Sequence, residues 1–174
     1  MRILGGEWAG RDLVSPSGRV RPTAEEVRDR WMDFLLADLS GARVLELYAG
    51  SGALGLEALS RGAASCDFVE NNPSAPHSLK ANVTSLRARG RTRIFKRDAL
   101  IFCEGVRPGG YDLVLADPPH GSRQLERLIE RWMAVPFSRI LSVEHAADHV
   151  VPRGGRVVRF EATVVTTYRA KSAG

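Results

Sequence analysis

Cysteine is scarce in this chain, and long apolar runs are missing. The 174 residues contain two cysteines, Cys66 and Cys103, which lie far apart and show no CxxC or cysteine–histidine spacing. This pattern favours reduced, buried thiols over a disulfide framework or a zinc site. His77, His145 and His149 also lack ligand spacing with acids or cysteines, so we predict no metal. No apolar stretch is long enough to cross a bilayer, and the amino terminus lacks the apolar segment of a signal peptide, so we expect a cytoplasmic protein without membrane contact.

The charge is unbalanced toward the positive side. Lys and Arg number 25 against 20 Asp and Glu, which gives a net charge of +5 and a sequence pI near 9.8. This excess permits an anionic partner but does not say which one. One segment carries seven positive residues before the next acid: Lys80, Arg87, Arg89, Arg91, Arg93, Lys96 and Arg97. Such a run is usually a solvated face.

The order of apolar segments predicts the fold class. Runs typical of strands alternate with stretches of helical period, which indicates a doubly wound α/β domain with a mostly parallel, Rossmann-like sheet. The last two strands are expected to form an antiparallel edge. The predicted strands are Val44–Tyr48, Cys66–Glu70, Thr92–Lys96, Leu113–Ala116, Ile140–Glu144, Val157–Phe160 and Val164–Tyr168.

Helix signals and a division of the chain accompany these strands. Thr23 and Glu26 fit a capping box at the start of one helix, whose inward positions would be Val27, Trp31, Phe34, Leu35 and Leu39. Asn72 opens a helix over Pro73–Arg87, and Ser122 is the candidate N-cap of a helix that buries Leu125, Leu128, Ile129, Trp132 and Met133. Before them, Met1–Val14 is predicted to be a short hairpin, followed by a turn-rich connection from Ser15 to Arg21. We therefore divide the chain into an extension, residues 1–22, and a main domain, residues 23–174.

A glycine-rich turn follows the first predicted strand. Gly50, Gly52 and Gly55 have the spacing G-x-G-x-x-G, which is also found in dinucleotide-binding folds. Small residues let a ligand approach the backbone, and the N–H groups at a helix start suit a pyrophosphate or the carboxylate of a methionine. Glu46, four residues earlier, could face the ammonium group of such a ligand or an ordering water, a position unfavourable for pyrophosphate.

Acidic residues at the next two strand ends suit a nucleoside. Glu70 ends the second predicted strand, where it can accept hydrogen bonds from ribose hydroxyls. Asp98 follows the third strand and is placed to accept from an adenine amine, with Asn71 and Ala99 flanking the ring. Together with the glycine turn, these residues favour a cofactor that combines an adenosine with an amino acid.

The segment Asp117-Pro118-Pro119-His120 ends the fourth predicted strand. An exocyclic amine on a nucleobase is a poor nucleophile because its lone pair is delocalised into the ring. A carboxylate and the Pro118 carbonyl that both accept from the amine would turn its lone pair toward a methyl donor. Two prolines keep this turn rigid, so little entropy is lost on binding. The combination predicts S-adenosylmethionine-dependent methylation of a nucleobase amine.

These residues resemble the RsmD family of small-subunit rRNA guanine-N2 methyltransferases, and the similarity runs nearly end to end. It is carried by Arg2-Ile3-Leu4-Gly5-Gly6 with Gly10-Arg11, by Arg21-Pro22-Thr23 with Val27-Arg28, and by the segment from Gly50 to Gly62. The resemblance implies a class I methyltransferase that acts on 16S rRNA in an assembling small subunit. His120 departs from it, because the family usually has Phe or Tyr there. The candidate cofactor contacts are Glu46, Tyr48, Gly50, Ser51, Gly52, Glu70, Asn71, Asp98, Ala99 and Asp117.

RNA contact is the expected use of the amino-terminal arginines. If the hairpin folds over the catalytic crevice, guanidinium groups there could bind phosphate while the pocket identifies the base. The candidate substrate contacts are Arg2, Arg11, Arg21, Thr23 and Arg28. Trp8 could stack on RNA or pack against the main domain, and both readings stay open.

Four alternatives remain at this point. The same Asp-Pro-Pro chemistry would serve a DNA or RNA adenine-N6 methyltransferase, and only the target distinguishes the two. A cytosine-C5 enzyme would need a thiolate beside the base, and a nicotinamide-dependent oxidoreductase would need a further substrate domain. If His120 marks lost activity, the chain could instead be a non-catalytic assembly factor that binds RNA.

Overall fold

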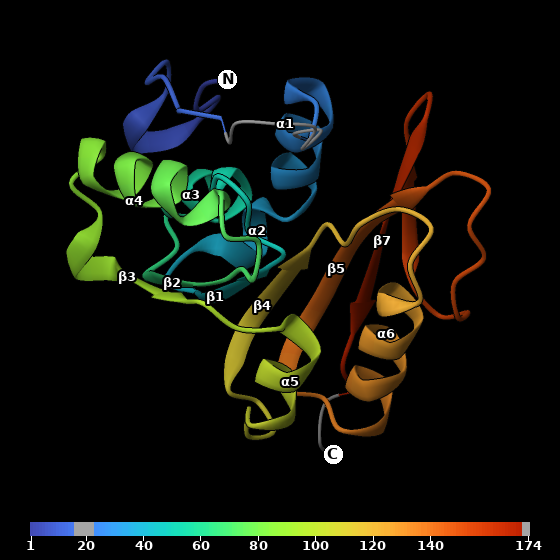
Figure 1. Ribbon diagram of the computed structural model, residues 1–174. Helices are drawn as coiled ribbons and strands as arrows, with labels where there is room; N and C mark the ends of the chain where they lie inside the picture. Colours follow the sequence, from blue (N-terminus) through green and yellow to red (C-terminus); the bar gives the residue numbers. More distant parts are fainter. Residues whose placement is uncertain (16–22, 172–174) are drawn as a thin grey trace.

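A single sheet organises the computed structural model, which describes residues 1–15 and 23–171 (Figure 1). Its seven strands follow the order β3-β2-β1-β4-β5-β7-β6. They are β1 (Arg43–Leu47), β2 (Ser65–Val69), β3 (Thr92–Phe95), β4 (Tyr111–Ala116), β5 (Ser138–Ala146), β6 (Arg156–Arg159) and β7 (Thr163–Arg169). Strands β1 to β5 are parallel, and β7 runs antiparallel to both of its neighbours. All seven predicted strands and the antiparallel edge are therefore confirmed, with ends moved by at most two residues.

Helices cover both faces of the sheet. The first four are α1 (Glu25–Phe34), α2 (Leu36–Leu39), α3 (Ala53–Ser60) and α4 (Ala75–Ser85). The others are α5 (Ala99–Glu104) and α6 (Gln124–Ala134), with 3-10 turns η1 (Gly6–Trp8) and η2 (Arg89–Arg91). In Figure 1, α3 and α4 lie with the amino terminus on one face, and α5 and α6 lie on the other. Within residues 1–15 and 23–171, no helix has the length and apolar character needed to span a membrane.

Side chains along each strand alternate between the two faces of the sheet and so form two apolar cores. On β1, Val44 belongs to the core under α1 to α4, whereas Leu45 and Leu47 belong to the core under α5 and α6. A strand buried on both faces reads as a nearly continuous apolar run, which is why these strands were visible in the sequence. The order of the strands reverses between β1 and β4, and ligand crevices in such sheets lie at the carboxyl ends of strands at this point.

The helix starts differ from the prediction. Helix α1 begins at Glu25 with Ala24 as its N-cap, so the capping box at Thr23 is wrong. Helix α6 begins at Gln124 with Arg123 as its N-cap, and the Ser122 hydroxyl donates to the Pro119 carbonyl instead. The hydroxyls of Thr23 and Ser122 instead donate to Asp117 and to the Pro119 carbonyl, in the turn after β4. Sequence periodicity does not reveal such contacts.

Other expectations about burial hold. Helix α4 starts at Ala75, two residues inside the predicted span, and Trp132 is confirmed as a core residue. Met133 is 41% exposed, so only part of the predicted apolar face of α6 is buried. Cys66 and Cys103 are free and buried as predicted, and burial raises the pKa of both thiols.

The amino-terminal segment is a minimal hairpin. Arg2 and Asp12 form one antiparallel bridge, and the Ile3 amide donates to the Arg11 carbonyl at 2.9 Å. The turn between the two arms contains η1 in place of a tight two-residue turn. The connection from residue 16 onward, Arg21, and the boundary placed after residue 22 lie outside the described residues.

Helix α3 holds this hairpin through two side chains that we call the clasp: Glu57 and Ser60. Glu57 accepts from the amides of Leu4 and Gly5, at 3.0 and 2.8 Å. Ser60 accepts from the Trp8 amide and donates to the Gly5 carbonyl. The hairpin is therefore fixed to the first face of the sheet.

Close approach to α3 explains the glycine at position 6 of the hairpin. Gly6 has φ +77°, and a Cβ there would lie 1.9 Å from the Ser60 carbonyl oxygen. Trp8 is only 8% exposed and the Arg91 guanidinium lies 4.8 Å from its ring centre, so packing is the observed role of this tryptophan.

Candidate active site

One cavity of about 550 Å³ lies at the carboxyl ends of β1, β2, β4 and β5, between the two halves of the sheet. Residues predicted from three different motifs meet in its wall. They are Tyr48 and Gly50 after β1, Glu70 and Asn71 after β2, and Asp117, Pro118, Pro119 and His120 after β4. The volume is in the range of ordinary small-ligand sites.

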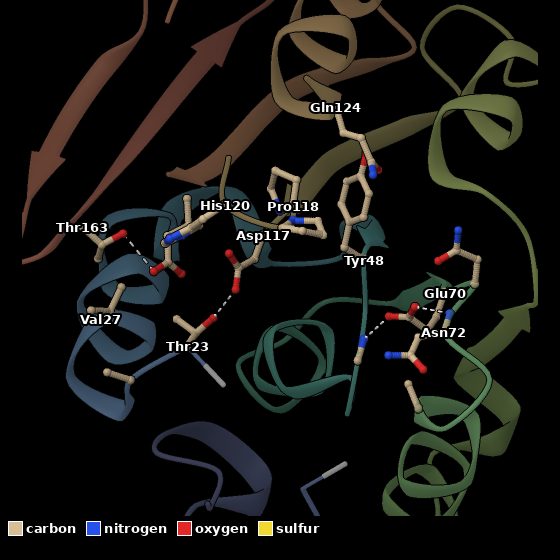
Figure 2. Close-up of a pocket in the computed structure, with 16 residues that line it drawn as sticks. Thr23, Val27, Tyr48, Glu70, Asn72, Asp117, Pro118, His120, Gln124 and Thr163 are labelled. Atoms are coloured by element: carbon tan, nitrogen blue, oxygen red, sulfur yellow. Dashed lines mark hydrogen bonds between the residues drawn. The ribbon is translucent and has the colours of Figure 1, made fainter. Parts of the chain in front are cut away.

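Asp117 points into this cavity and is held from the opposite wall (Figure 2). The Thr23 hydroxyl donates a hydrogen bond of 3.0 Å to Asp117 Oδ2. Thr23 was predicted to contact substrate; its observed contact is with the carboxylate that would orient the substrate. The Asp117 carboxylate therefore has a defined direction before any ligand binds.

Hydrogen bonds from Ser122 close the turn after Asp117. Pro118 is buried, whereas Pro119 and His120 are exposed at the cavity mouth. The Ser122 hydroxyl and amide both donate to the Pro119 carbonyl, at 2.8 and 3.4 Å. This leaves the His120 ring at the rim, where a base entering the cavity would pass.

The glycine turn approaches the cavity at Gly50. Gly50 has φ +52°, and a Cβ there would point into open space within the cavity wall. Gly52 and Gly55 are glycines for a different reason. A Cβ at Gly52 would lie 2.3 Å from Leu79 Cδ1, and one at Gly55 would lie 2.5 Å from Cys66 Sγ. Only the first glycine of the motif lines the cavity, and the others permit close packing of α3.

Glu70 fastens the glycine turn to the end of β2. Its two carboxylate oxygens accept from the amides of Gly50 and Asn72, each at 2.7 Å (Figure 2). Each oxygen keeps a further lone pair, so the carboxylate can also accept from hydroxyls in the cavity. The position predicted for a ribose contact is thus part of the cavity wall.

Glu46 does not have the predicted position. It is 3% exposed, lies outside the cavity wall and accepts from the Gly55 amide at 2.8 Å. Burial raises the pKa of Glu46 to about 8, while the amides of Gly55 and Leu54 act against this rise. The expected contact of Glu46 with a ligand ammonium is therefore corrected: its carboxylate instead accepts a hydrogen bond from the first turn of α3.

Four other candidate cofactor residues are absent from the cavity lining. Asp98 is the N-cap of α5 and accepts from the Ile101 amide at 3.0 Å. Among the described residues, the lining of the cavity does not include Asp98, Ala99, Ser51 or Gly52. Helix α5 itself was not predicted, although the Asp98-Ala99 step is an ordinary helix start. The adenine contacts expected from Asp98 and Ala99 therefore stay a prediction.

The described arginines of the amino-terminal region, in residues 1–15 and from 23 onward, do not line the cavity. Arg28 is fully buried, pairs with Glu57 at 3.5 Å and donates to the Arg2 carbonyl, so it cannot reach phosphate. Its predicted role is corrected to a structural one. Arg2 pairs with Glu25, and Arg11 donates to the Ser85 carbonyl at the end of α4.

The basic run follows α4 and the edge strand β3. Two of its members have acidic partners: Arg91 pairs with Glu7 at 3.3 Å, and Arg93 pairs with Asp67 at 2.6 Å. Arg93 remains 72% exposed in its side chain, as a solvated edge would be. This agrees with the interpretation of the run as a solvated face.

Glu144 and Thr163 are two of the cavity-wall residues that the sequence pattern missed. Glu144 lies near the carboxyl end of β5 and Thr163 begins β7, and both line the cavity. The Thr163 hydroxyl donates to Glu144 Oε1 at 3.0 Å. The sequence contained a signal for Glu144, because this acid ends the fifth predicted strand just as Glu70 ends the second.

Comparison with known proteins places this site in a family. A family model described as "Conserved hypothetical protein 95" matches residues 1–158. Ribosomal RNA small subunit methyltransferase D of Escherichia coli K12 is 38% identical over 158 residues, which cover 87% of this chain and 78% of the relative. The chain belongs to the RsmD family.

Solved structures agree with the family assignment. The yhhF protein of Escherichia coli, whose description assigns it provisionally to the methyltransferases, has a TM-score of 0.85 and 30% identity. The match covers 99% of this chain and 98% of yhhF. An RNA methyltransferase of Salinibacter ruber in complex with S-adenosyl-L-homocysteine shares the fold, with a TM-score of 0.65 and 18% identity over 86% and 93% of the two chains. The class I methyltransferase fold and the family resemblance predicted from the sequence are confirmed.

Proposed function

We propose that this member of the RsmD family uses S-adenosyl-L-methionine to methylate the exocyclic N2 amine of a guanine in 16S rRNA. The observation that carries the proposal is the Asp117 carboxylate, which faces the cavity beside the glycine turn and is held by Thr23 at 3.0 Å. The name of the Escherichia coli relative supports rRNA as the acceptor. The choice of guanine N2 comes from the resemblance of the chain to its family.

The cavity fits the cofactor at its glycine end. Gly50 leaves room where a Cβ would project, and Glu70 presents a carboxylate that is already oriented by two amides. These residues would hold the backbone of the amino acid portion and the ribose, respectively, with Asn71 beside the nucleoside. When bound, S-adenosylmethionine supplies an electrophilic methyl group on a sulfonium sulfur.

The chain's own residues prepare the amine. Asp117 and the Pro118 carbonyl accept hydrogen bonds from the two N–H groups, which turns the nitrogen lone pair toward the methyl donor. Because Thr23 fixes the carboxylate, the amine is oriented rather than merely bound, and such positioning can contribute roughly 7–11 kcal/mol in favourable cases. Asp117 also stabilises the positive charge that develops on nitrogen. His120 at the rim offers a ring on which the base can stack.

The acceptor is proposed to be an assembling small ribosomal subunit, which places the protein in the cytoplasm. The net charge of +5 supports an anionic partner. The target nucleotide must leave its stack to enter the cavity, at a cost of a few kcal/mol. Exposed cations along α4 and β3 can contact phosphate without reading sequence.

The test is to identify the product base. The protein is incubated with labelled S-adenosylmethionine and either naked small-subunit rRNA or assembling particles, and the RNA is then digested and analysed by mass spectrometry. We expect N2-methylguanine at one position. Methyladenine as the product, or no transfer to either acceptor, would refute the proposal.

A pair of variants separates chemistry from folding. Asp117→Asn removes the charged acceptor and should lower turnover at least about a hundredfold, while cofactor affinity measured by calorimetry stays within about threefold. Asp148→Asn makes the same change at an exposed site outside the cavity and should have wild-type turnover. Equal turnover of Asp117→Asn and wild type would contradict the assigned role.

A further inference from the structure

Glu144 stands beside Asp117 at the end of the neighbouring strand. In the parallel pair β4–β5, Ala116 is the last residue of β4 and is in register with Val143, so Asp117 and Glu144 are the residues that directly follow this pair. Adjacent strands lie about 4.8 Å apart, and successive partners across a parallel pair face the same side. Both carboxylates line the same cavity. A base held by one is therefore within reach of the other.

The Glu144 side chain is fixed in direction. The residue is 6% exposed, and its Oε1 accepts from the Thr163 hydroxyl at 3.0 Å, a bond drawn in Figure 2. Thr163 is anchored in turn, because it begins β7 and its hydroxyl also lies 2.9 Å from the His145 carbonyl. Across the antiparallel pair, Glu144 is in register with Val165, so two strands determine where its carboxyl group sits. An acceptor built this firmly can discriminate between ligands.

Guanine differs from the other amino-bearing bases at the atom next to its amine. The N2 amine of guanine is flanked by N1–H, which is a donor. The N6 amine of adenine is flanked by N1, and the N4 amine of cytosine by N3, and both ring nitrogens are acceptors. A flipped base is read by hydrogen bonds to this edge. A second carboxylate beside the amine therefore attracts guanine, whereas it faces a lone pair in adenine or cytosine.

We propose that Glu144 accepts the N1–H of the target guanine while Asp117 holds the N2 amine, and that this contact selects guanine over adenine and cytosine. The inference rests on the proposed function and adds the residue that determines its base specificity. Thr163 is a positioning residue for Glu144. The two adjacent strand ends then recognise two adjacent donors of one base.

The experiment uses a change in the base that matches a change in the protein. Once the modified position is located, small-subunit particles are assembled on rRNA that carries either guanine or 2-aminopurine there. 2-Aminopurine keeps the N2 amine but has a lone pair at N1. Wild-type protein should favour guanine in kcat/KM by about 10- to 100-fold, the size of one good discriminating contact. Equal use of the two bases by the wild type would overturn the inference without any variant.

Glu144→Gln then tests the residue itself. The Gln amide can donate to the N1 lone pair, so the ratio of guanine to 2-aminopurine should fall at least about tenfold, and intrinsic differences in amine reactivity cancel in this comparison. Glu161→Gln is the matched control, since Glu161 is exposed near the start of β7, and it should keep the wild-type ratio. Cofactor affinity by calorimetry reports that both variants are folded.

The outcomes separate the two proposals. If the wild type makes N2-methylguanine but Glu144→Gln retains the wild-type base ratio, this inference fails and the proposed function stands. If the wild type makes no N2-methylguanine, the proposed function fails, and this inference fails with it.

Discussion

Replacing Glu57 by Gln should destabilise the protein more than any surface change. Glu57 and Arg28 both have fully buried side chains, and their charged groups lie 3.5 Å apart. Removing the negative charge leaves the Arg28 guanidinium buried without its counterion, which typically costs about 3–5 kcal/mol. For a chain of this size, each kcal/mol shifts the thermal midpoint by about 2–4 °C, so the midpoint should fall by roughly 10 °C. Thermal and urea unfolding followed by circular dichroism measure this change.

Arg28→Met provides the comparison that can refute the reasoning. In this variant Glu57 keeps the Arg61 guanidinium at 3.0 Å and the amides of Leu4 and Gly5, so the remaining charge is still compensated. Arg28→Met should therefore cost clearly less than Glu57→Gln, and the double variant should be less destabilised than the sum of the two. Equal costs for the two single variants, or a cost below about 1 kcal/mol for Glu57→Gln, would show that Glu57 does not stabilise the fold by neutralising the buried Arg28 charge.

Three further predictions concern the cavity and its support. Burial raises the pKa of Glu46 from 4.5 to about 8, so the folded protein retains a proton that the unfolded chain releases, and the free energy of unfolding should fall as the pH rises from about 5 to 8. Glu46→Gln should flatten this fall, whose slope is at most about 1.4 kcal/mol per pH unit. If urea unfolding at several pH values gives the same slope for the variant and the wild type, the prediction is contradicted. Gly50→Ala puts a methyl group into the cavity at φ +52° and should weaken S-adenosylmethionine binding at least about tenfold by calorimetry, whereas wild-type affinity would argue against the cofactor position. Thr23→Val removes the 3.0 Å bond to Asp117 and should lower kcat about tenfold with cofactor affinity unchanged, while Thr23→Ser restores it; an effect on affinity alone would be inconsistent with positioning.

The strands were predictable because their signal is local. Val44, Leu45 and Leu47 are apolar toward both faces of a covered parallel sheet, and this pattern can be read without knowing what covers it. The acid at the end of a strand was equally visible, which is how Glu70 and Asp117 were placed in the cavity wall.

Partners that are distant in the chain could not be predicted in the same way. Thr23 has the spacing of a capping box, but its hydroxyl bonds Asp117, which is 94 positions away. Arg28 looks like any arginine of a surface helix, and only tertiary packing shows that Glu57 neutralises it in the interior. Glu46 was placed by analogy with a ligand contact, whereas the nearest donors to its carboxylate belong to the adjoining helix turn. Local pattern reports burial and period, and it does not report which polar groups meet.

The clasp on α3 also determines when the amino-terminal hairpin can fold during synthesis. Leu4, Gly5 and Trp8 are held by side chains that follow them by 52 or 53 positions. A chain emerging from the ribosome therefore exposes its first residues, including a tryptophan, before the helix that receives them exists. Contacts of this separation form slowly because the intervening loop must close first. Nascent chains stopped before residue 57 should leave Trp8 accessible to quenchers, and chains that extend well past α3 and β2 should protect it.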